Sequence, residues 1–318
     1  MKQNLFRRRN EATWRELEQA LRPDAPPELR ARFPRIYRRT CQHLAVARTR
    51  LYSARLIEHL DQLVLAGHQR LYGSGPAHRG RLGTFFGTDF PRAVRQEWRL
   101  VLVSALVFFL PLLGMLVAPQ VDPDVVYTVL DADTLVEMEG MYEPGEDRVG
   151  RSRDSDSDVL MFAFYVYNNT GIGFRTFAGG LLFGIGTLFI LFYNGLVIGT
   201  VAGHLTRIGY GEPFWSFVAG HSALELTAVV LSGAAGLRLG LALLAPGRRR
   251  RREALRLGAA TAVRIVGGAA AMFLAAAFVE GFWSSMTFPP PGLKYATGIL
   301  FWVLVLGYLL LQGRGRGA

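Results

Sequence analysis

The C-terminal two thirds of the chain consist of long apolar segments that alternate with short polar stretches. A helix that crosses a membrane needs about 20 predominantly apolar residues. The pattern therefore predicts an all-α, polytopic membrane domain over residues 99–318, preceded by a polar helical domain. The expected spans are residues 100–118, 176–203, 257–280 and 293–311, together with an irregular apolar segment at 214–244.

The irregular segment 214–244 is too long for one ordinary span and is interrupted by three glycines and Arg238. We expect span 176–203 to end on the cytoplasmic side, where the arginine run 248–252 must also lie. A segment that starts and finishes on one side cannot cross the membrane once. The sequence thus predicts a broken pair of helices, either re-entrant or crossing twice, whose irregular backbone is covered by protein or water.

Between the first two spans lies a strongly acidic segment, the expected extracytoplasmic insertion 119–175. Its last part, 159–174, is apolar but short and contains Asn168 and Asn169. We therefore expect an amphipathic helix in the outer membrane interface. The alternating aspartates of residues 154–158 lack the glycine and the bidentate glutamate that an EF-hand loop requires, so a solvated loop is a better interpretation than a calcium site.

Residues 1–98 show the pattern of a small helical domain. Asn10 is a suitable N-cap for a helix over residues 11–21, which the following prolines end. Apolar residues three and four apart predict a second helical region over about 34–72. Because that region is long for one helix, we expect a break near residues 51–53.

The charge is distributed unevenly along the chain, whose net charge is +11. Residues 1–99 carry 20 basic and 9 acidic side chains, whereas residues 119–174 carry 3 basic and 12 acidic ones. Lys and Arg accumulate on the cytoplasmic side of membrane proteins, so both termini are predicted to be cytoplasmic in a multi-pass membrane protein. No apolar run in residues 1–99 suits a signal peptide, and the single Cys41 excludes an intrachain disulfide.

The arginines of residues 1–99 also bear on the kind of partner. No fold signature of a nucleic-acid-binding protein surrounds them, and attraction to anionic lipid headgroups accounts for their excess. We therefore expect membrane lipids and other membrane proteins as partners, and not nucleic acid.

Candidate chemistry centres on His221 and Glu225, which are four residues apart and share one face of a helix. An acid alone at a helix centre costs about 2.5–3.5 kcal/mol on insertion scales, so the pair should face other helices or a wet cavity. A polar tie between helices and a role in proton or ion handling both remain open. Charge balance predicts that Arg238 or Arg264 joins the pair. The candidate intramembrane polar centre is His221, Glu225, Arg238, Arg264, Glu280 and Asn194.

Glycines at intervals of four residues mark the expected packing face of span 176–203. Such spacing lets helix backbones approach closely. The partner of this face is another span or a second copy of the chain, which leaves homo-oligomerisation open. The packing residues are Gly180, Gly184, Gly195, Gly199 and Gly203.

Several of these residues occur in motifs that resemble the stage II sporulation protein M family of bacterial membrane proteins. Ser222 stands where the family usually has glycine, but a small residue is kept. The N-terminal helices are similar to those of the longer, non-sporulating members. The carrying residues are Asn169 and the stretches 194–199, 221–226, 233–237 and 278–282, with 35–39, 60–64 and 85–91 in the N-terminal part.

The resemblance implies a role in assembly rather than catalysis. In spore formers the namesake is a membrane scaffold that recruits peptidoglycan-degrading partners. The long members are associated with other membrane proteins and with MoxR-type ATPases. The resemblance carries over no catalytic, cofactor-binding or metal-binding residue, and it does not imply sporulation here.

Three classes of function compete. The leading hypothesis is a non-enzymatic integral inner-membrane protein that scaffolds or recruits a membrane or cell-envelope complex. A transporter or channel is the alternative, because a broken segment that carries His221, Glu225 and Arg238 resembles the discontinuous helices of transport sites. An intramembrane metallohydrolase is disfavoured: His221 and Glu225 supply two ligands, and His204 would be a third only by an accident of the fold.

Overall fold

The computed structural model describes residues 3–22, 24–72, 78–145, 150 and 158–314, and the regular secondary structure of these residues is entirely helical. This confirms the expected all-α class. The chain divides into two compact units between Gly83 and Thr84, rather than at the expected residue 98. The boundary lies earlier because residues 85–96 pack on the membrane helices. Phe90 is fully buried and lies against Gly268.

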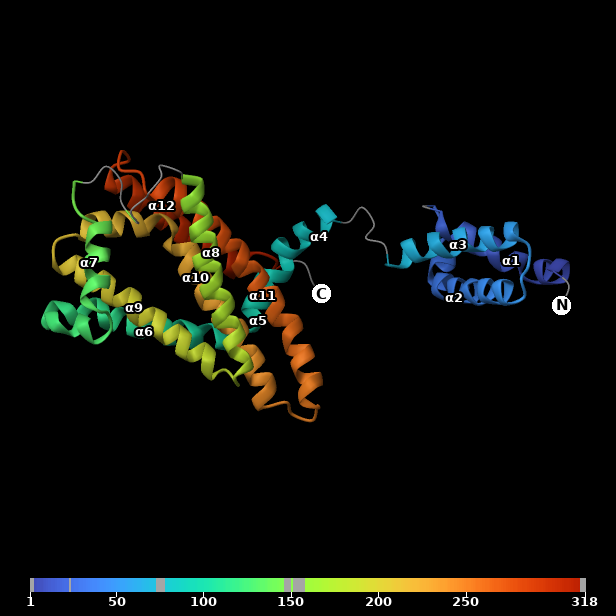
Figure 1. Ribbon diagram of the computed structural model, residues 1–318, viewed down its shortest axis with the longest axis horizontal. Helices are drawn as coiled ribbons and strands as arrows, with labels where there is room; N and C mark the ends of the chain where they lie inside the picture. Colours follow the sequence, from blue (N-terminus) through green and yellow to red (C-terminus); the bar gives the residue numbers. More distant parts are fainter. Residues whose placement is uncertain (1–2, 23, 73–77, 146–149, 151–157, 315–318) are drawn as a thin grey trace. The chain divides into compact units, whose positions relative to one another are not determined.

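The N-terminal unit contains three packed helices: α1 Gln3–Leu21, α2 Pro27–Thr49 and α3 Ala54–Tyr72 (Figure 1). The expected break in the long helical region is confirmed at Leu51, which adopts a left-handed φ of 50°. Gly67 lets α3 pack closely on the ring of Tyr37 in α2. The unit's core includes Phe6, Trp14, Leu17, Ile36, Leu44 and Leu60.

The predicted start of the first helix is wrong. Helix α1 begins at Gln3 instead of Glu11, and the Asn10 side chain donates a hydrogen bond to the Phe6 carbonyl one turn back. The second helix also starts earlier, at Pro27, because proline is tolerated in the first helical turn, where its missing N–H would have no partner.

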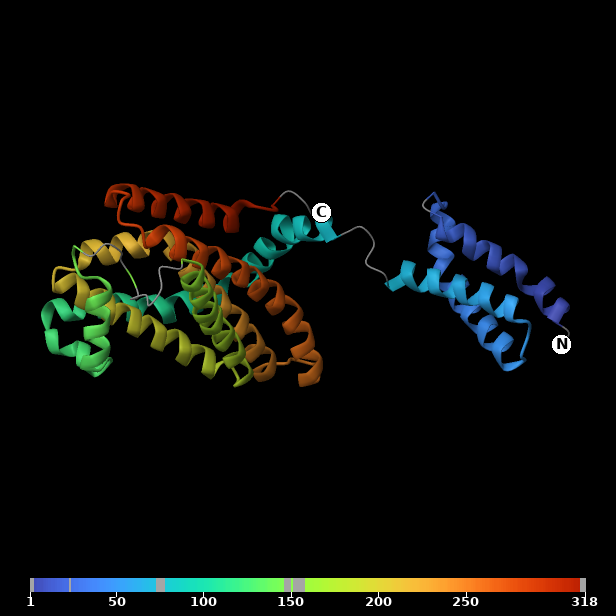
Figure 2. The same ribbon diagram turned by 45° about the horizontal axis from the view of Figure 1, so that its top comes forward.

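The second unit begins at the last residue of α4, and the described residues beyond it form twelve further helical segments. Five of its helices are long and apolar enough to cross a membrane: α6, α9, α10, α11 and α12. The segments are α4 His78–Thr84, η1 Phe85–Asp89, α5 Phe90–Gln96, α6 Trp98–Val121, η2 Pro123–Thr128, α7 Ala132–Met141, α8 Asp158–Ala178, η3 Gly179–Leu181, α9 Ile185–Arg207, α10 Gly211–Leu244, α11 Arg251–Val279, η4 Glu280–Ser284 and α12 Pro291–Leu311 (Figures 1 and 2).

One end of this bundle, here called the basic end, comprises residues 84–97, 178–186, 238–252 and 308–314. Three contacts tie these stretches together. The Arg95 guanidinium donates to the Leu309 carbonyl at 2.7 Å, and Arg238 pairs with Glu97 at 2.8 Å. The third is the close approach of the Gly184 and Gly240 backbones.

The opposite end, here called the acidic end, comprises residues 121–142, 207–213 and 280–291. Close to it, near the end of α9, His204 Nε2 lies 2.6 Å from the Glu139 carboxylate in α7. The Tyr142 ring packs edge-on against Phe214, with the ring centroids 5.1 Å apart. Most of the described acidic residues outside the N-terminal unit lie at this end.

Helices α6 and α9 run parallel along each other (Figures 1 and 2). Gly195 faces Phe108, Gly199 faces Leu112 and Gly203 faces Leu116. The residue numbers therefore increase in the same direction along both helices. Helix α6 leads from the basic end to the acidic end, and α9 does the same. The expectation that span 176–203 ends beside the cytoplasmic arginines is therefore wrong.

Helix α8 leads the chain back from the acidic end to the basic end, between α6 and α9. Near its start, Phe162 contacts Gly281 close to the acidic end, and just beyond its last residue Gly180 lies against the Gly236 backbone near the basic end. Its 21 residues span about 31 Å, close to the thickness of a bilayer core. An interfacial helix would lie across the bundle end, so the interfacial assignment of 159–174 is wrong. The expected span 176–203 also starts too early, because α9 begins only at Ile185.

Helix α10 is continuous over 34 residues, so the predicted break in 214–244 is wrong as well. Its glycines do not interrupt the helix: Gly236 and Gly240 admit the backbone of the turn between α8 and α9. Because α9 ends at the acidic end, α10 starts there and reaches the arginine run 248–252 in a single passage. Six helices thus connect the two ends of the bundle, and Thr84 and Arg314 lie at the same end.

Candidate functional site

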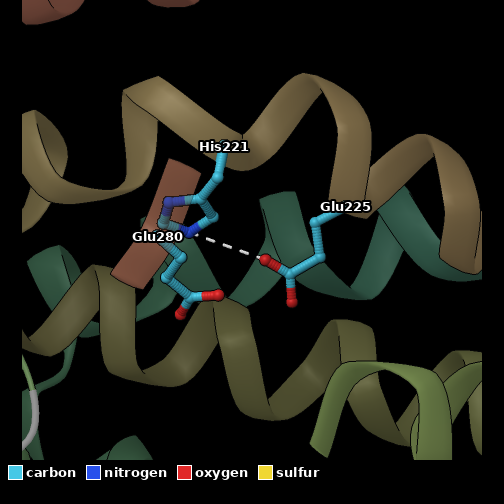
Figure 3. Close-up of side chains that lie close together, drawn as sticks. All are labelled: His221, Glu225 and Glu280. Carbon is cyan, nitrogen blue, oxygen red and sulfur yellow. Dashed lines mark ion pairs between the residues drawn. The ribbon is translucent and has the colours of Figure 1, made fainter. Parts of the chain in front are cut away.

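Three ionisable side chains converge near the acidic end of the bundle. His221 and Glu225 project from one face of α10, and Glu280 points toward them from the start of η4 (Figure 3). His221 Nε2 lies 3.5 Å from a Glu225 oxygen. One ligand atom from each of the three residues lies within 4.8 Å of the others. We call these three residues the polar cluster.

A local irregularity positions Glu280 and its neighbour Ser284. Helix α11 does not end as a regular α-helix but widens into the π-helical turn η4. Such turns re-aim side chains and are frequent at functional sites. Here the turn directs Glu280 and Ser284 toward α10, and Gly281 gives Phe162 of α8 room to approach.

Hydrogen bonds fix two members of the polar cluster. The Ser284 hydroxyl lies 3.0 Å from His221 Nδ1, and the Asn169 amide donates to a Glu280 oxygen at 3.1 Å. Lys294 Nζ donates to the Ser284 carbonyl at 2.9 Å, which adds α12 to the same network. The polar cluster and its hydrogen-bond partners therefore join α8, α10, η4 and α12.

The charges of the polar cluster are poorly balanced. Among the described residues, neither Glu225 nor Glu280 forms an ion pair with an arginine or lysine. His221 and Glu280 are buried, and the Glu225 side chain is 19% exposed. Two carboxylates side by side in a low-dielectric environment repel each other strongly unless a proton or a cation compensates them.

Aromatic rings pack beside the polar cluster. The Phe217 ring packs edge-on against His221, with centroids 5.3 Å apart, and Tyr142 packs on Phe217. Burial raises the pKa of the Tyr142 phenol well above its usual value, and nearby Tyr165, Glu280 and Glu225 reinforce that direction. Tyr142 thus stays neutral and carries an O–H group.

The remaining members of the predicted polar centre lie elsewhere, which corrects that prediction. Arg238 is at the basic end, where it pairs with Glu97. Arg264 is exposed on α11. Asn194 donates to the Ile190 carbonyl within its own helix at 2.7 Å. His204 is likewise outside the polar cluster, paired with Glu139.

Sequence reasoning missed Asn169, Ser284 and Lys294. Asn169 was part of a recognised motif, but its assignment to an interfacial helix placed it away from the bundle interior. Lys294 is almost completely buried, although it begins an apolar helix and resembles a membrane-surface anchor. No short-range spacing links these residues, because they come from different helices.

The predicted packing glycines have two different roles. Gly195, Gly199 and Gly203 allow the contact of α9 with α6; a Cβ at Gly199 would lie 2.8 Å from Leu112 Cα. Gly180 and Gly184 are not on that face, because they belong to the turn between α8 and α9. Gly180 contacts α10, and Gly184 adopts a φ of 86° that favours glycine. The aspartates of residues 154–157 lie outside the described residues.

Two family models match the chain. The family model for Stage II sporulation protein M matches residues 100–285, which is more than half of the chain and includes the whole polar cluster. A second family model, a domain of unknown function (DUF8413), matches residues 4–73, the three-helix N-terminal unit. No curated protein and no solved structure matches the chain. The chain belongs to the stage II sporulation protein M family.

Proposed function

We propose that this protein is a non-enzymatic scaffold of the bacterial inner membrane that recruits partners for a cell-envelope complex. The basic end and both termini face the cytoplasm, in keeping with the preference of Lys and Arg for that side. The acidic end faces outward. The partners are other membrane proteins and, for the N-terminal unit, a soluble component such as a MoxR-type ATPase.

The observation that carries the proposal is the set of contacts that tie the polar cluster to neighbouring helices. His221 is bonded to Ser284, Glu225 lies beside His221, and Glu280 is bonded to Asn169. These groups bind helices together and are suited to holding a platform in one shape. The alternative of a transporter rested on a discontinuous helix, and α10 is continuous.

The N-terminal unit offers a surface for the soluble partner. A polar hollow of about 470 Å³ lies on it. Both charge signs are present, so a partner can be recognised by complementary charge rather than by apolar burial. The lining includes Arg7, Glu11, Arg15, Glu18, Arg55 and His59.

Purification of the full chain in mild detergent, with identification of co-purifying proteins, tests the proposal. We expect a membrane protein and an ATPase to co-purify. The double variant Arg7→Glu, Arg15→Glu should lose the ATPase and keep the membrane partner. Arg256→Glu, a change at an exposed position of α11, should keep both.

A flux assay in proteoliposomes separates the scaffold from a transporter. The scaffold predicts that Glu225→Gln leaves co-purification intact and that neither the parent nor this variant conducts protons or ions. Proton flux through the parent that Glu225→Gln abolishes, together with an absence of specific partners, would overturn the proposal.

A further inference from the structure

We propose that His221, Glu225 and Glu280 bind one divalent transition-metal ion, which fastens α10 to the end of α11. The polar cluster has the donor set for this: one imidazole nitrogen and carboxylate oxygens from two residues. Zn²⁺, Mn²⁺ and Fe²⁺ accept this combination of nitrogen and oxygen ligands. The site goes beyond the scaffold function and does not depend on it.

The distances suit such a site. Zinc lies about 2.0–2.2 Å from imidazole nitrogen and carboxylate oxygen, so two ligand atoms on a tetrahedral ion are about 3.4 Å apart. The separation of 3.5 Å between His221 Nε2 and Glu225 Oε2 is close to that value. All three ligand atoms lie within 4.8 Å of one another, so the widest separation has to shorten by no more than about 1.4 Å to reach the tetrahedral value. Figure 3 shows the three side chains pointing to a common region.

The surrounding groups orient the ligands as they do around known metal sites. A hydrogen bond at one imidazole nitrogen fixes the tautomer that presents the other to a metal, and ligating carboxylates are themselves hydrogen-bonded. Ser284 contacts His221 Nδ1, which leaves Nε2 on the side of Glu225. Asn169 holds one oxygen of Glu280.

A dication balances the charge of the polar cluster when both carboxylates are ionised. Two ionised carboxylates and a neutral imidazole carry a charge of about −2, which one divalent ion neutralises. The described residues provide no arginine or lysine in an ion pair with either carboxylate. A single shared proton would leave one negative charge next to buried apolar helices.

The ion links segments that are far apart in the chain. Glu225 and His221 belong to α10, whereas Glu280 starts the π-helical turn η4. Without the ion, η4 still contacts α10 at this level through the hydrogen bond of Ser284 with His221 and the packing of Trp283 near Gly220. We therefore expect metal removal to loosen η4 and to lower the thermal stability of the whole bundle.

The test uses the full chain, purified in detergent with a tag that contains no histidine. After growth in medium with added zinc, manganese and iron, elemental analysis should find about one ion per chain. The shape-preserving variants Glu225→Gln and Glu280→Gln should weaken binding of the recovered metal by more than about tenfold in equilibrium dialysis. Glu139→Gln, which alters the separate pair of His204 with Glu139, should bind as the parent does.

A second measurement stays informative if the variants fold poorly. The stripped parent protein, loaded with Co²⁺, should show visible d–d absorption, and X-ray absorption should show imidazole and oxygen ligands. A chelator should lower the melting temperature of the parent, and the recovered metal should restore it. The proposal is overturned if the stripped parent binds none of the three metals at a stoichiometric level, or if Glu225→Gln and Glu280→Gln bind as strongly as the parent.

Discussion

Glu280 depends on a single amide that lies 111 residues earlier in the chain, the side chain of Asn169. Both residues are buried. Leaving a buried acceptor without its partner costs about 1–3 kcal/mol, and more when the group is charged. Asn169 is thus the residue whose removal reports most directly on the polar cluster.

Asn169→Ala should lower the free energy of unfolding by about 1–3 kcal/mol, because Glu280 loses its donor. Asn194→Ala is the matched control, since the Asn194 side chain bonds only to its own helix and its loss should cost little. Thermal or denaturant unfolding in detergent measures both. Equal stabilities of the two variants would show that the contact with Glu280 contributes nothing.

The N-terminal unit contains a histidine, His43, whose protonation affects the stability of the unit. The Trp14 indole donates to His43 Nδ1 at 3.1 Å, which requires that nitrogen to be unprotonated. Burial, reinforced by the charge of Arg39, lowers the His43 pKa below its usual value of 6.5. The unfolded chain therefore binds a proton more readily than the folded unit does.

Acidification should accordingly destabilise this unit. The contribution of His43 is present above its unfolded pKa and is lost as the pH falls through that value toward the lower, folded pKa. Amide hydrogen exchange in α1 and α2 should become faster from neutral pH to about pH 5 after correction for intrinsic rates. His43→Gln keeps an acceptor for Trp14 but does not titrate, so its exchange should not show this step.

Single residues also show where sequence reasoning works. The spacing of His221 and Glu225 predicted their shared face, and the scarcity of acids in the spans pointed to Glu280. Arg238 is 13 residues beyond Glu225, or about 20 Å along a continuous helix, so it cannot reach the same place. Charge balance had suggested that the two lie together, which a break in 214–244 would have allowed.

Among the helices, the contact of α6 with α9 depends on backbone proximity. Gly199→Leu should disrupt it, because the new side chain would overlap Leu112 of α6. We expect loss of monodisperse protein, or a melting temperature lowered by several degrees, in size-exclusion and thermal assays. Gly114→Leu is the control: nothing lies near a Cβ at Gly114, so the same change should be tolerated. A stable Gly199→Leu protein would mean that this contact does not form.

Helix α8 shows why hydropathy alone led to the wrong assignment of residues 159–174 to the membrane interface. Its polar residues face protein as well as the surroundings: Asn169 and Thr176 are buried, whereas Leu160 and Tyr167 are exposed. The mean hydropathy of the helix therefore understates how well the helix fits the bundle. The partners that satisfy its polar groups lie in η4 and within its own turns, and a window of neighbouring residues cannot reveal the former.

In the whole molecule, the number of times that the chain crosses the bundle determines at which end each loop between helices lies. Reporter fusions at Phe183 and Gly247 should read cytoplasmic, because both lie at the basic end. A fusion at Gly209, between α9 and α10, should read external. A cytoplasmic reading at Gly209 would restore the broken segment at 214–244 and contradict a passage by α8.

The overall class, the N-terminal helical unit and most apolar spans were predictable, because long apolar runs and local spacing determine them. The order of passages was not. Assigning α8 to the interface removed one passage, and a hairpin at 214–244 was then needed to keep the arginine run on the cytoplasmic side. The second error followed from the first, because topology is counted cumulatively from one end of the chain.

The burial of Asn169 in the bundle also constrains biosynthesis. Helix α8 is not among the five described helices whose length and composition alone suit a membrane passage, so we expect it to enter lipid as a single segment less readily than they do. Its partner Glu280 is synthesised 111 residues later. We therefore expect the nascent chain to keep α8 sheltered, next to earlier helices or an insertion factor, until α10 and α11 emerge, and the membrane bundle to mature late and not one helix at a time.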